Sequence, residues 1–291
     1  MTLLIAALLQ VDWQKDHATV VAKAKADGKF ALVHFEAAWC GSCQRMSDET
    51  LKEEAVVKAM ASFVCVRLDV EKEPKLWKDL YQGRVHPSTF ILTPEGEIVS
   101  RIVDMRGAKA MASSLASIPD RVKKLRDAEK VAGDDGLLAV AAARGELEDP
   151  PGATDAYSKL LKSSVRKNVA IAAARLATLR SDDEQWDEAE RMADLFDKSD
   201  PENTTRMGEE VVLPRVFALY FGKQQAEDAL KALRAGEKRF ESSKLMDRWM
   251  FLEGTLLRER GDRDAAADVW KKCAETFPAT EWGRRAKKMI Q

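Results

Sequence analysis

One stretch decides the fold: residues 30–43 read FALVHFEAAWCGSC. Its first six residues, Phe30–Phe35, are nearly all apolar, which is typical of a central strand buried on both faces. The segment Trp39-Cys40-Gly41-Ser42-Cys43 follows, and a helical run then extends to Met60. A buried strand that leads directly into a helix predicts a layered α/β architecture.

The flanking sequence predicts the rest of this first domain. A helix is expected from Asp16 to Ala26, ending at Gly28, and a last helix from Ala108 to Ser117. Parallel strands need right-handed crossovers, and the turn Thr93–Gly96 adds an antiparallel edge hairpin. The other expected elements, in chain order, are a strand Phe63–Val70, a short helix Glu73–Tyr81, a strand Ser88–Leu92 and a strand Glu97–Val103.

The two closely spaced cysteines carry the candidate chemistry. Cys40 falls at the start of a helix, where converging backbone N–H groups favour a thiolate. Cys43 lies about one turn further along, on the same side. The Cys40 thiolate can attack a disulfide of another molecule, and Cys43 can then displace the product from the mixed disulfide. The spacing therefore predicts a two-electron dithiol–disulfide switch.

At this point the chain resembles the thioredoxin family over roughly residues 12–118. The motifs that carry the resemblance occur in the family's order and separations: Leu32-Val33-His34-Phe35, Trp39-Cys40-Gly41-Ser42-Cys43 and Val85-His86-Pro87-Ser88-Thr89-Phe90. The chain looks most like the extracytoplasmic branch that includes disulfide-reductase domains, because Asp48-Glu49-Thr50-Leu51 follows the cysteines and Thr93-Pro94-Glu95-Gly96 closes the late hairpin.

The resemblance implies a role for each residue around the sulfurs. Cys40 would be the nucleophile and Cys43 the resolving thiol. Pro87 would be a cis proline that shapes the substrate groove. Four residues would contact a substrate strand or surround the sulfurs, namely Trp39, Gly41, Ser42 and His86.

The chain departs from the family pattern at buried and redox-tuning positions. His34 stands where the family commonly has a buried acid, and Arg67 where it has lysine. In the family that acid takes a proton from the inner cysteine, so His34 either does this work or is a hydrogen-bonded core residue. Burial beside Arg67 would keep His34 neutral. Glu36, two residues further along the same strand, is a weaker candidate. Ser42 replaces the usual proline, so the direction of exchange does not follow from the motif.

The charge balance and the small number of clustered metal-binding side chains argue against nucleic-acid binding and against a metal site. The 47 Lys plus Arg residues nearly balance the 48 Asp plus Glu, and no basic stripe appears, so nucleic acid is not an expected partner. A structural zinc site needs about four ligands and only Cys40 and Cys43 cluster, so no metal and no cofactor are expected. Cys65 and Cys273 are expected to be packed as small apolar side chains.

The sequence changes character near residues 118–120, which predicts a domain boundary between residues 12–118 and 119–291. After it, Ala, Leu, Glu, Lys and Arg recur at helical spacing. The segment from Met246 to Thr280 resembles a tetratricopeptide repeat, with Gly254, Ala266 and Pro278 as its small and terminating residues. Three or four helical hairpins are expected, stacked as a solenoid that docks a protein partner.

Residues 1–11 form a possible signal segment or an N-terminal extension. The apolar run Leu3–Leu9 is too short to span a bilayer, so no integral membrane segment is expected. It lacks a preceding Lys or Arg and a clear cleavage site, so it is read either as an export signal or as an apolar turn or strand packed on the first domain. The expected location is periplasmic or otherwise extracytoplasmic, with the cytoplasm as the alternative.

Two functions compete. The first is a thiol–disulfide oxidoreductase, of reductase or isomerase type, that acts on protein disulfides through Cys40 and Cys43. The second is a redox-linked holdase or adaptor, because a thioredoxin-like domain followed by tetratricopeptide-like repeats also resembles the chaperedoxin architecture. In the second case client binding would dominate over turnover.

Overall fold

The chain forms two compact units that divide between Ala153 and Thr154. They are seen in a computed structural model that describes residues 11–290. The possible signal segment lies almost wholly in residues 1–10, outside the described residues. Within residues 11–290, no helix is both long and apolar enough to cross a membrane.

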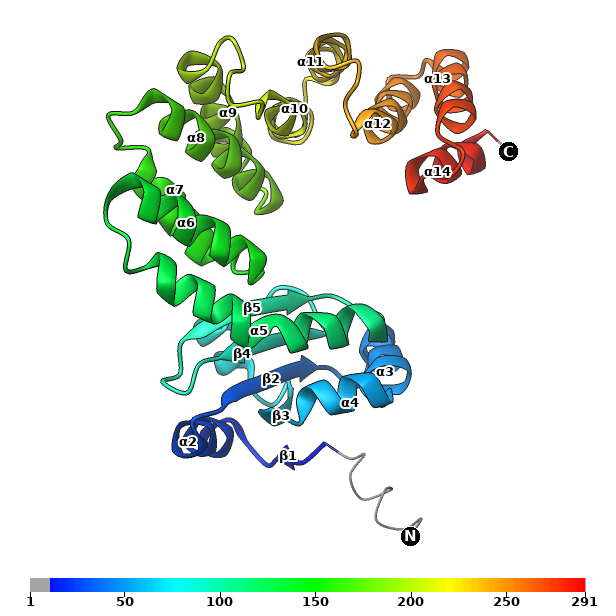
Figure 1. The fold of residues 1–291 in the computed structure, drawn as a ribbon. Helices are drawn as coiled ribbons and strands as arrows, with labels where there is room; N and C mark the ends of the chain where they lie inside the picture. The colour runs from blue at the N-terminus through cyan, green and yellow to red at the C-terminus, as the bar shows by residue number, and fades with distance from the viewer. Residues whose placement is uncertain (1–10, 291) are drawn as a thin grey trace. The chain divides into compact units, whose positions relative to one another are not determined.

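The first unit is built on a five-stranded sheet with the strand order β1-β3-β2-β4-β5. The central strand β2 (Phe30–Glu36) runs parallel to β3 (Phe63–Asp69) and antiparallel to β4 (Ser88–Leu92). β1 (Trp13–Gln14) and β5 (Ile98–Val103) form the two edges (Figure 1). The predicted α/β sandwich with an antiparallel edge hairpin is therefore confirmed.

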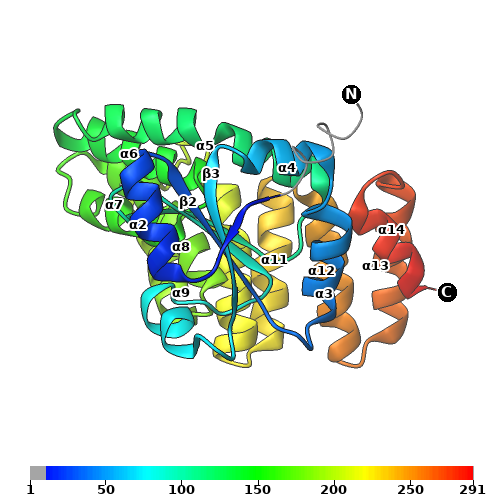
Figure 2. The ribbon, with the colours of Figure 1, turned by 90° about the horizontal axis from the view of Figure 1, so that it is seen from below.

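Helices cover both faces of this sheet, and local sequence signals set their ends. The helix α2 (His17–Asp27) begins at Asp16, whose carboxylate accepts a hydrogen bond from the Thr19 amide, and ends at Gly28, whose φ of 62° suits glycine. The strands β2 and β3 run between α2 and α4 (Figure 2). The remaining helical elements of the sheet region are α3 (Gly41–Arg45), the π-helical segments η2 (Met46–Thr50) and η3 (Leu76–Leu80), α4 (Glu54–Met60) and α5 (Ala108–Ala128).

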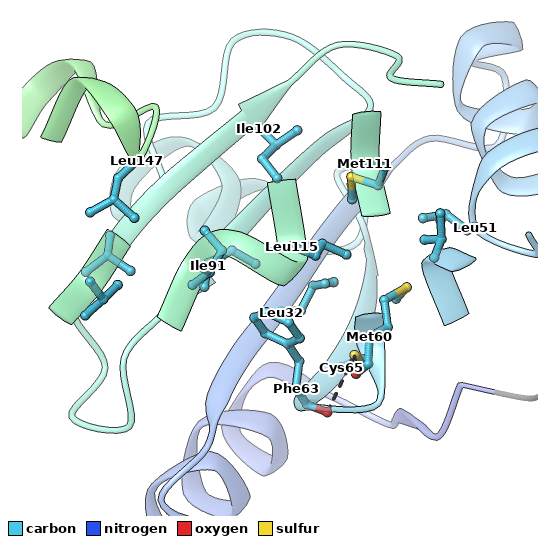
Figure 3. Close-up of a cluster of buried hydrophobic side chains, with 14 of the residues drawn as sticks. Leu32, Leu51, Met60, Phe63, Cys65, Ile91, Ile102, Met111, Leu115 and Leu147 are labelled. Carbon is cyan, nitrogen blue, oxygen red and sulfur yellow. Dashed lines mark hydrogen bonds between the residues drawn. The ribbon is translucent and has the colours of Figure 1, made fainter. Parts of the chain in front are cut away.

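Alternation along β2 splits the core into two layers. Leu32 packs with Met60 and Leu115 on the side of α4 and α5, as Figure 3 shows. Val33 and Phe35 pack on the opposite side, with the α2 residues and with aromatic side chains of η3 and its flanks. Because successive strand residues point to opposite faces, His34 and Glu36 share the face of Leu32.

The helical run expected from Cys43 to Met60 is interrupted, because residues 51–53 separate η2 from α4. Leu51 packs into the core at this break (Figure 3). Thr50 Oγ1 donates a hydrogen bond to the Arg106 carbonyl. The interruption thus lies where Leu51 packs into the core and Thr50 bonds to the segment before α5.

The boundary expected at residue 118 falls inside a helix. Pro119 lies within α5, where it removes only one backbone donor, and the helix continues to Ala128. Apolar side chains beyond the proline still pack on the sheet, including Leu125 and, from the end of α6 (Gly133–Glu146), Leu147 (Figure 3). Tertiary packing thus keeps this segment helical and attached, and the first unit extends to Ala153.

A buried ion network holds this extension against β5. Asp149 is 2% exposed and accepts hydrogen bonds from Arg101 and from Arg144, the latter at 2.9 Å. Arg144 also reaches Glu97 at 2.7 Å. The Arg101 amide donates to the Glu148 carbonyl at 3.1 Å. Residues 144–149 are therefore bonded directly to the edge of the sheet.

The second unit is helical. From α8 (Arg166–Asp182) onward, the α-helices follow one another in chain order, each in contact with the next (Figure 1). Ala266, a small residue of the predicted repeat, is almost wholly buried, and so are Ala156, Ala189 and Ala229 in earlier helices. Assignment of these helices to tetratricopeptide repeats stays a prediction. The elements are α7 (Pro150–Leu160), which crosses the division between the units, α8 (Arg166–Asp182), α9 (Trp186–Ser199), η4 (Gly208–Val211), α10 (Val212–Phe217), η5 (Ala218–Gly222), α11 (Ala226–Arg239), α12 (Met246–Glu259), α13 (Arg263–Thr276) and α14 (Glu281–Met289).

Candidate active site

The predicted cysteine pair forms a disulfide at the start of α3, directly after β2 (Figure 1). Cys40 is the N-cap residue, and its sulfur accepts a hydrogen bond from the Cys43 amide at 3.1 Å. Ser42 Oγ lies 3.3 Å from the same sulfur. Cys40 is 6% exposed and Cys43 only 1%, so Cys40 is the sulfur that meets solvent first. A thiolate at this position would receive one backbone donor and one hydroxyl donor.

The segment before β4 faces the exposed side of this pair. The His86–Pro87 peptide bond is cis, as the resemblance implies. The carbonyl oxygen of His86 lies 3.8 Å from Cys40 Sγ. The indole of Trp39 is 65% exposed and packs edge-on against the His86 ring at 4.9 Å between centroids. Gly41 is exposed, and a Cβ added there would meet no atom within 4 Å. These residues form an accessible rim around Cys40.

His34 lies behind the rim, in the interior. Its side chain is wholly buried, and its Nδ1 lies 2.9 Å from Thr89 Oγ1 on the neighbouring strand β4. Burial, followed by the positive charge of Arg67, lowers the pKa of His34 to about 3. The imidazole is therefore neutral at physiological pH, which agrees with the sequence prediction of a neutral His34 beside Arg67.

The Glu36 carboxylate lies between the His34 imidazole and the Arg67 guanidinium. Glu36 Oε2 lies 3.9 Å from His34 Nε2, and Glu36 Oε1 lies 3.7 Å from Arg67 Nε. Neither nitrogen has a hydrogen-bond partner among the described residues, although both are buried. Arg67 is otherwise held by the Ser47 hydroxyl, which accepts from Nη1 at 3.0 Å, and by the Trp13 ring under its guanidinium.

Comparison with known proteins addresses the first unit. A family model described as thioredoxin-like matches residues 12–94. Thioredoxin of Mycobacterium tuberculosis is 32% identical over 97 residues, which are 33% of this chain and 78% of that protein. The chain belongs to the thioredoxin family.

Two further matches to this thioredoxin-family chain carry the name DsbD. The thiol:disulfide interchange protein DsbD 2 of Pseudomonas aeruginosa is 34% identical over 80 residues. The match takes in 26% of this chain but only 14% of that protein's length. The oxidised C-terminal domain of Neisseria meningitidis DsbD is 24% identical, with a TM-score of 0.29, over 33% of this chain and 86% of that domain.

A cleft opens beside Cys43 of this thioredoxin-family chain. It measures about 290 Å³ and includes Cys43 in its lining. Its walls come from the ends of β2 and β3, from residues 37–38, and from α3 and η2. The lining residues are Glu36, Ala37, Ala38, Cys43, Gln44, Ser47, Asp48 and Asp69. His34 does not line this cleft, whereas Glu36 does.

The structure thus brings most of the predicted residues together and adds others. Ser42 and His86 lie beside the Cys40 sulfur, Trp39 packs on His86, and Pro87 forms the cis peptide bond that follows His86. The sequence did not identify Thr89 as the partner of His34, although the register of β2 with β4 pairs the two residues. It also ranked Glu36 below His34, although the two share a face by strand alternation.

The two remaining cysteines are separate from this site. Burial raises the pKa of Cys65 to about 12 and that of Cys273 to about 11. Each sulfur lies near backbone carbonyls in a packed interior. Within the part of the chain that the structure describes, no three His, Cys, Asp or Glu side chains are grouped so as to hold a metal ion.

Proposed function

We propose that the protein is a thiol–disulfide oxidoreductase that acts on protein disulfides through Cys40 and Cys43. The observation that carries this proposal is the geometry of one sulfur. Cys40 is the N-cap of α3, and its sulfur accepts a hydrogen bond from the Cys43 amide. The same sulfur lies 3.8 Å from the His86 carbonyl oxygen, next to the cis peptide bond to Pro87. The rim around it exposes an indole and backbone, which suits an extended peptide rather than a small charged substrate.

In the proposed reaction Cys40 attacks and Cys43 resolves. The Cys40 thiolate attacks a substrate disulfide and forms a mixed disulfide, releasing one substrate thiolate. Cys43 then attacks Cys40 and releases the second. Trp39, Gly41, Ser42 and His86 contact the substrate, and Pro87 shapes the groove. His34 is assigned to the proton path of Cys43 rather than to substrate contact, because its side chain is wholly buried.

The test uses single-cysteine variants of the whole chain. Cys40→Ser is expected to abolish reduction of insulin disulfides, and Cys43→Ser to accumulate mixed disulfides with clients. Cys65→Ser is the matched control, since that thiol is buried and its pKa is raised to about 12. Insulin reduction by Cys40→Ser at the wild-type rate would refute the proposal.

The helical unit is proposed to dock the protein that carries the disulfide. Phe221 is 54% exposed and stacks on Trp186 with 5.5 Å between ring centroids. Exposed aromatic pairs of this kind are enriched at protein-binding surfaces. Phe221→Ser should reduce the amount of client trapped by Cys43→Ser. Val165→Ser, which removes an exposed side chain of the same unit, should leave it unchanged.

The holdase or adaptor function makes a different prediction with the same reagents. If client binding dominates, a Cys40→Ser/Cys43→Ser variant suppresses aggregation of an unfolding client as well as the wild type does. The oxidoreductase proposal expects turnover to be the activity that this variant loses. An extracytoplasmic location belongs to the same proposal, and the compartment of the trapped clients tests it.

A further inference from the structure

Resting on the proposed function, we propose that Glu36 accepts the Cys43 proton during resolution of the mixed disulfide and that His34 is its positioning residue. The Cys43 thiol must lose a proton before it can attack Cys40, because the thiolate is the nucleophile. Cys43 is 1% exposed, so bulk water does not reach it freely. Water in the cleft beside Cys43 is a weak base, so a carboxylate on the same cleft would accept the thiol proton more readily.

The cleft supplies the route from sulfur to carboxylate. Cys43 and Glu36 both line it, and its volume of about 290 Å³ has room for several water molecules, each of which occupies about 30 Å³. The side chain of Glu36 is 26% exposed and reaches both the cleft and the interior. The side chain of His34 is wholly buried and is not part of the cleft wall.

The surroundings of Glu36 can stabilise it with or without a proton. Its two oxygens lie 3.7 Å from Arg67 Nε and 3.9 Å from His34 Nε2, slightly beyond hydrogen-bond distance from both. A shift of about 1 Å gives the carboxylate a charge-assisted hydrogen bond from Arg67. The opposite shift lets the protonated acid donate its O–H to the neutral imidazole. Both nitrogens are buried and otherwise unpartnered among the described residues, so each shift satisfies one of them.

The contact with Thr89 lets His34 form a hydrogen bond with Glu36 whether Glu36 is ionised or protonated. The Thr89 hydroxyl can donate or accept, so the 2.9 Å contact with Nδ1 is satisfied in either imidazole tautomer. His34 can therefore present Nε2 as a donor to the carboxylate or as an acceptor to the acid. This is a positioning role, since His34 remains neutral throughout.

Two other acidic groups lie near Glu36, and only one of them is paired with a lysine among the contacts of the described residues. Asp69 on β3 pairs in register with Glu36, and Asp48 lies across the cleft, where Lys52 neutralises it at 2.6 Å. Burial raises the pKa of Glu36, Arg67 opposes this rise, and Asp69 adds to it. A carboxyl group whose pKa is raised from its ordinary range is better matched to exchanging a proton near neutral pH.

The step balances as follows. The Cys43 S–H proton passes through cleft water to the Glu36 carboxylate. The resulting thiolate forms a bond to Cys40 Sγ, and the bond between Cys40 Sγ and the substrate sulfur breaks. The electron pair leaves with the substrate sulfur, which takes a proton from solvent. The substrate disulfide is reduced, the Cys40–Cys43 pair is oxidised, and Glu36 returns its proton to solvent through the cleft.

The test separates attack from resolution with dithionitrobenzoate and the reduced full-length chain. The first thionitrobenzoate released reports attack by Cys40, and the second reports closure by Cys43. Glu36→Gln is expected to slow the second release about 100-fold at pH 7 and to change the first less than about threefold. Its closure rate should rise steadily with pH, because hydroxide replaces the lost acceptor. Asp48→Asn, on the same cleft, is the matched control and should close at the wild-type rate.

Two further variants keep the test decisive. Glu36→Asp, which keeps the acid but moves it back along the strand, should close about tenfold slower than wild type with the same shape of pH profile. His34→Leu should fold and attack normally, and its closure profile should shift to lower pH because the acceptor for the Glu36 O–H is gone. Closure within about threefold of wild type in Glu36→Gln overturns the inference. If that variant does not fold, wild-type closure in Glu36→Asp overturns it.

Failure of the proposed function has a different signature. A wild type that does not reduce insulin, but whose closure depends on Glu36, disproves action on protein disulfides and leaves the proton role standing. If the wild type reduces insulin but its closure rate does not depend on Glu36, the proton role is disproved and action on protein disulfides stands.

Discussion

Ser42 occupies the position inside the cysteine motif that decides how strongly the dithiol form is stabilised. Its hydroxyl lies 3.3 Å from Cys40 Sγ. A hydroxyl donor can stabilise the Cys40 thiolate of the reduced protein, but it gains far less from a neutral disulfide sulfur. Removing it with Ser42→Ala therefore destabilises the reduced form more than the oxidised form.

The size of this effect follows from the hydrogen bond. A bond to a charged group contributes about 1.5–3 kcal/mol, and the lower end applies because the contact is long and Ser42 is half-buried. For a two-electron couple, about 1.4 kcal/mol corresponds to about 30 mV. We expect the reduction potential of Ser42→Ala to be about 30 mV more negative than that of the wild type.

The assay is equilibration of each protein in glutathione redox buffers, with the reduced fraction counted by thiol alkylation and mass spectrometry. Ser42→Thr keeps the hydroxyl and should return the potential to within about 10 mV of the wild type. A potential that is unchanged or less negative in Ser42→Ala would show that the hydroxyl does not act on the Cys40 sulfur.

Four further predictions concern stability. Burial and then Arg67 lower the pKa of His34 to about 3 in the folded chain, whereas the unfolded chain binds this proton near pH 6.5. The stability that neutral His34 contributes is therefore complete above pH 6.5. It is lost as the pH falls towards 3, at up to about 1.4 kcal/mol per pH unit. Urea unfolding at pH 7.5 and 5.5 should show this slope in the wild type and not in His34→Leu. Asp149→Ala should lower the unfolding free energy of the first unit by about 3 kcal/mol, measured by hydrogen exchange, because Arg101 and Arg144 stay buried without the Asp149 carboxylate. The control Asp127→Ala, on the surface of α5, should have no measurable effect in the same assay. Gly254→Ala should cost about 1–3 kcal/mol, since its Cβ would lie 2.5 Å from Trp270 Nε1, and the unobstructed Gly145→Ala should be neutral or stabilising by thermal melting. A fragment ending at residue 118 should show less amide protection in β5 than one ending at 153; equal protection would place the domain boundary at 118 after all.

The strands and the first helix could be predicted because their signals are local. Phe30–Phe35 is an uninterrupted apolar run, and β2 extends it by one residue, to Glu36. Asp16 and Gly28 are the predicted limits of the first helix, and both act as its caps. In each case the sequence neighbours alone determine the backbone conformation, so no tertiary information was needed.

The end of α5 could not be predicted, because it depends on distant residues. Pro119 is a helix-ending signal, and the composition changes at the same point. The helix nevertheless continues, since Val122 and Leu125 still have a core to pack against and Leu147 returns to the same core from α6. Burial of these side chains outweighs the single hydrogen bond that the proline removes.

The candidate site was predicted as a set of residues but not as a set of distances. The motif located the sulfurs and the cis proline, because their chemistry needs a fixed order along the chain. The contact of His34 with Thr89, and the position of Glu36 between two nitrogens, arise from strand register. Register is set by the whole sheet, so a single strand's sequence does not reveal it.

The bond between the Arg101 amide and the Glu148 carbonyl has a consequence for crowded solutions. An outermost strand normally offers unpaired amides to any neighbouring chain, which is how sheets of separate molecules join and aggregate. In this chain the middle of that edge is already taken by its own backbone, with a buried charge cluster alongside. The opposite edge is only two residues long. Within the described residues, both edges of the sheet therefore offer little free backbone for another chain to pair with.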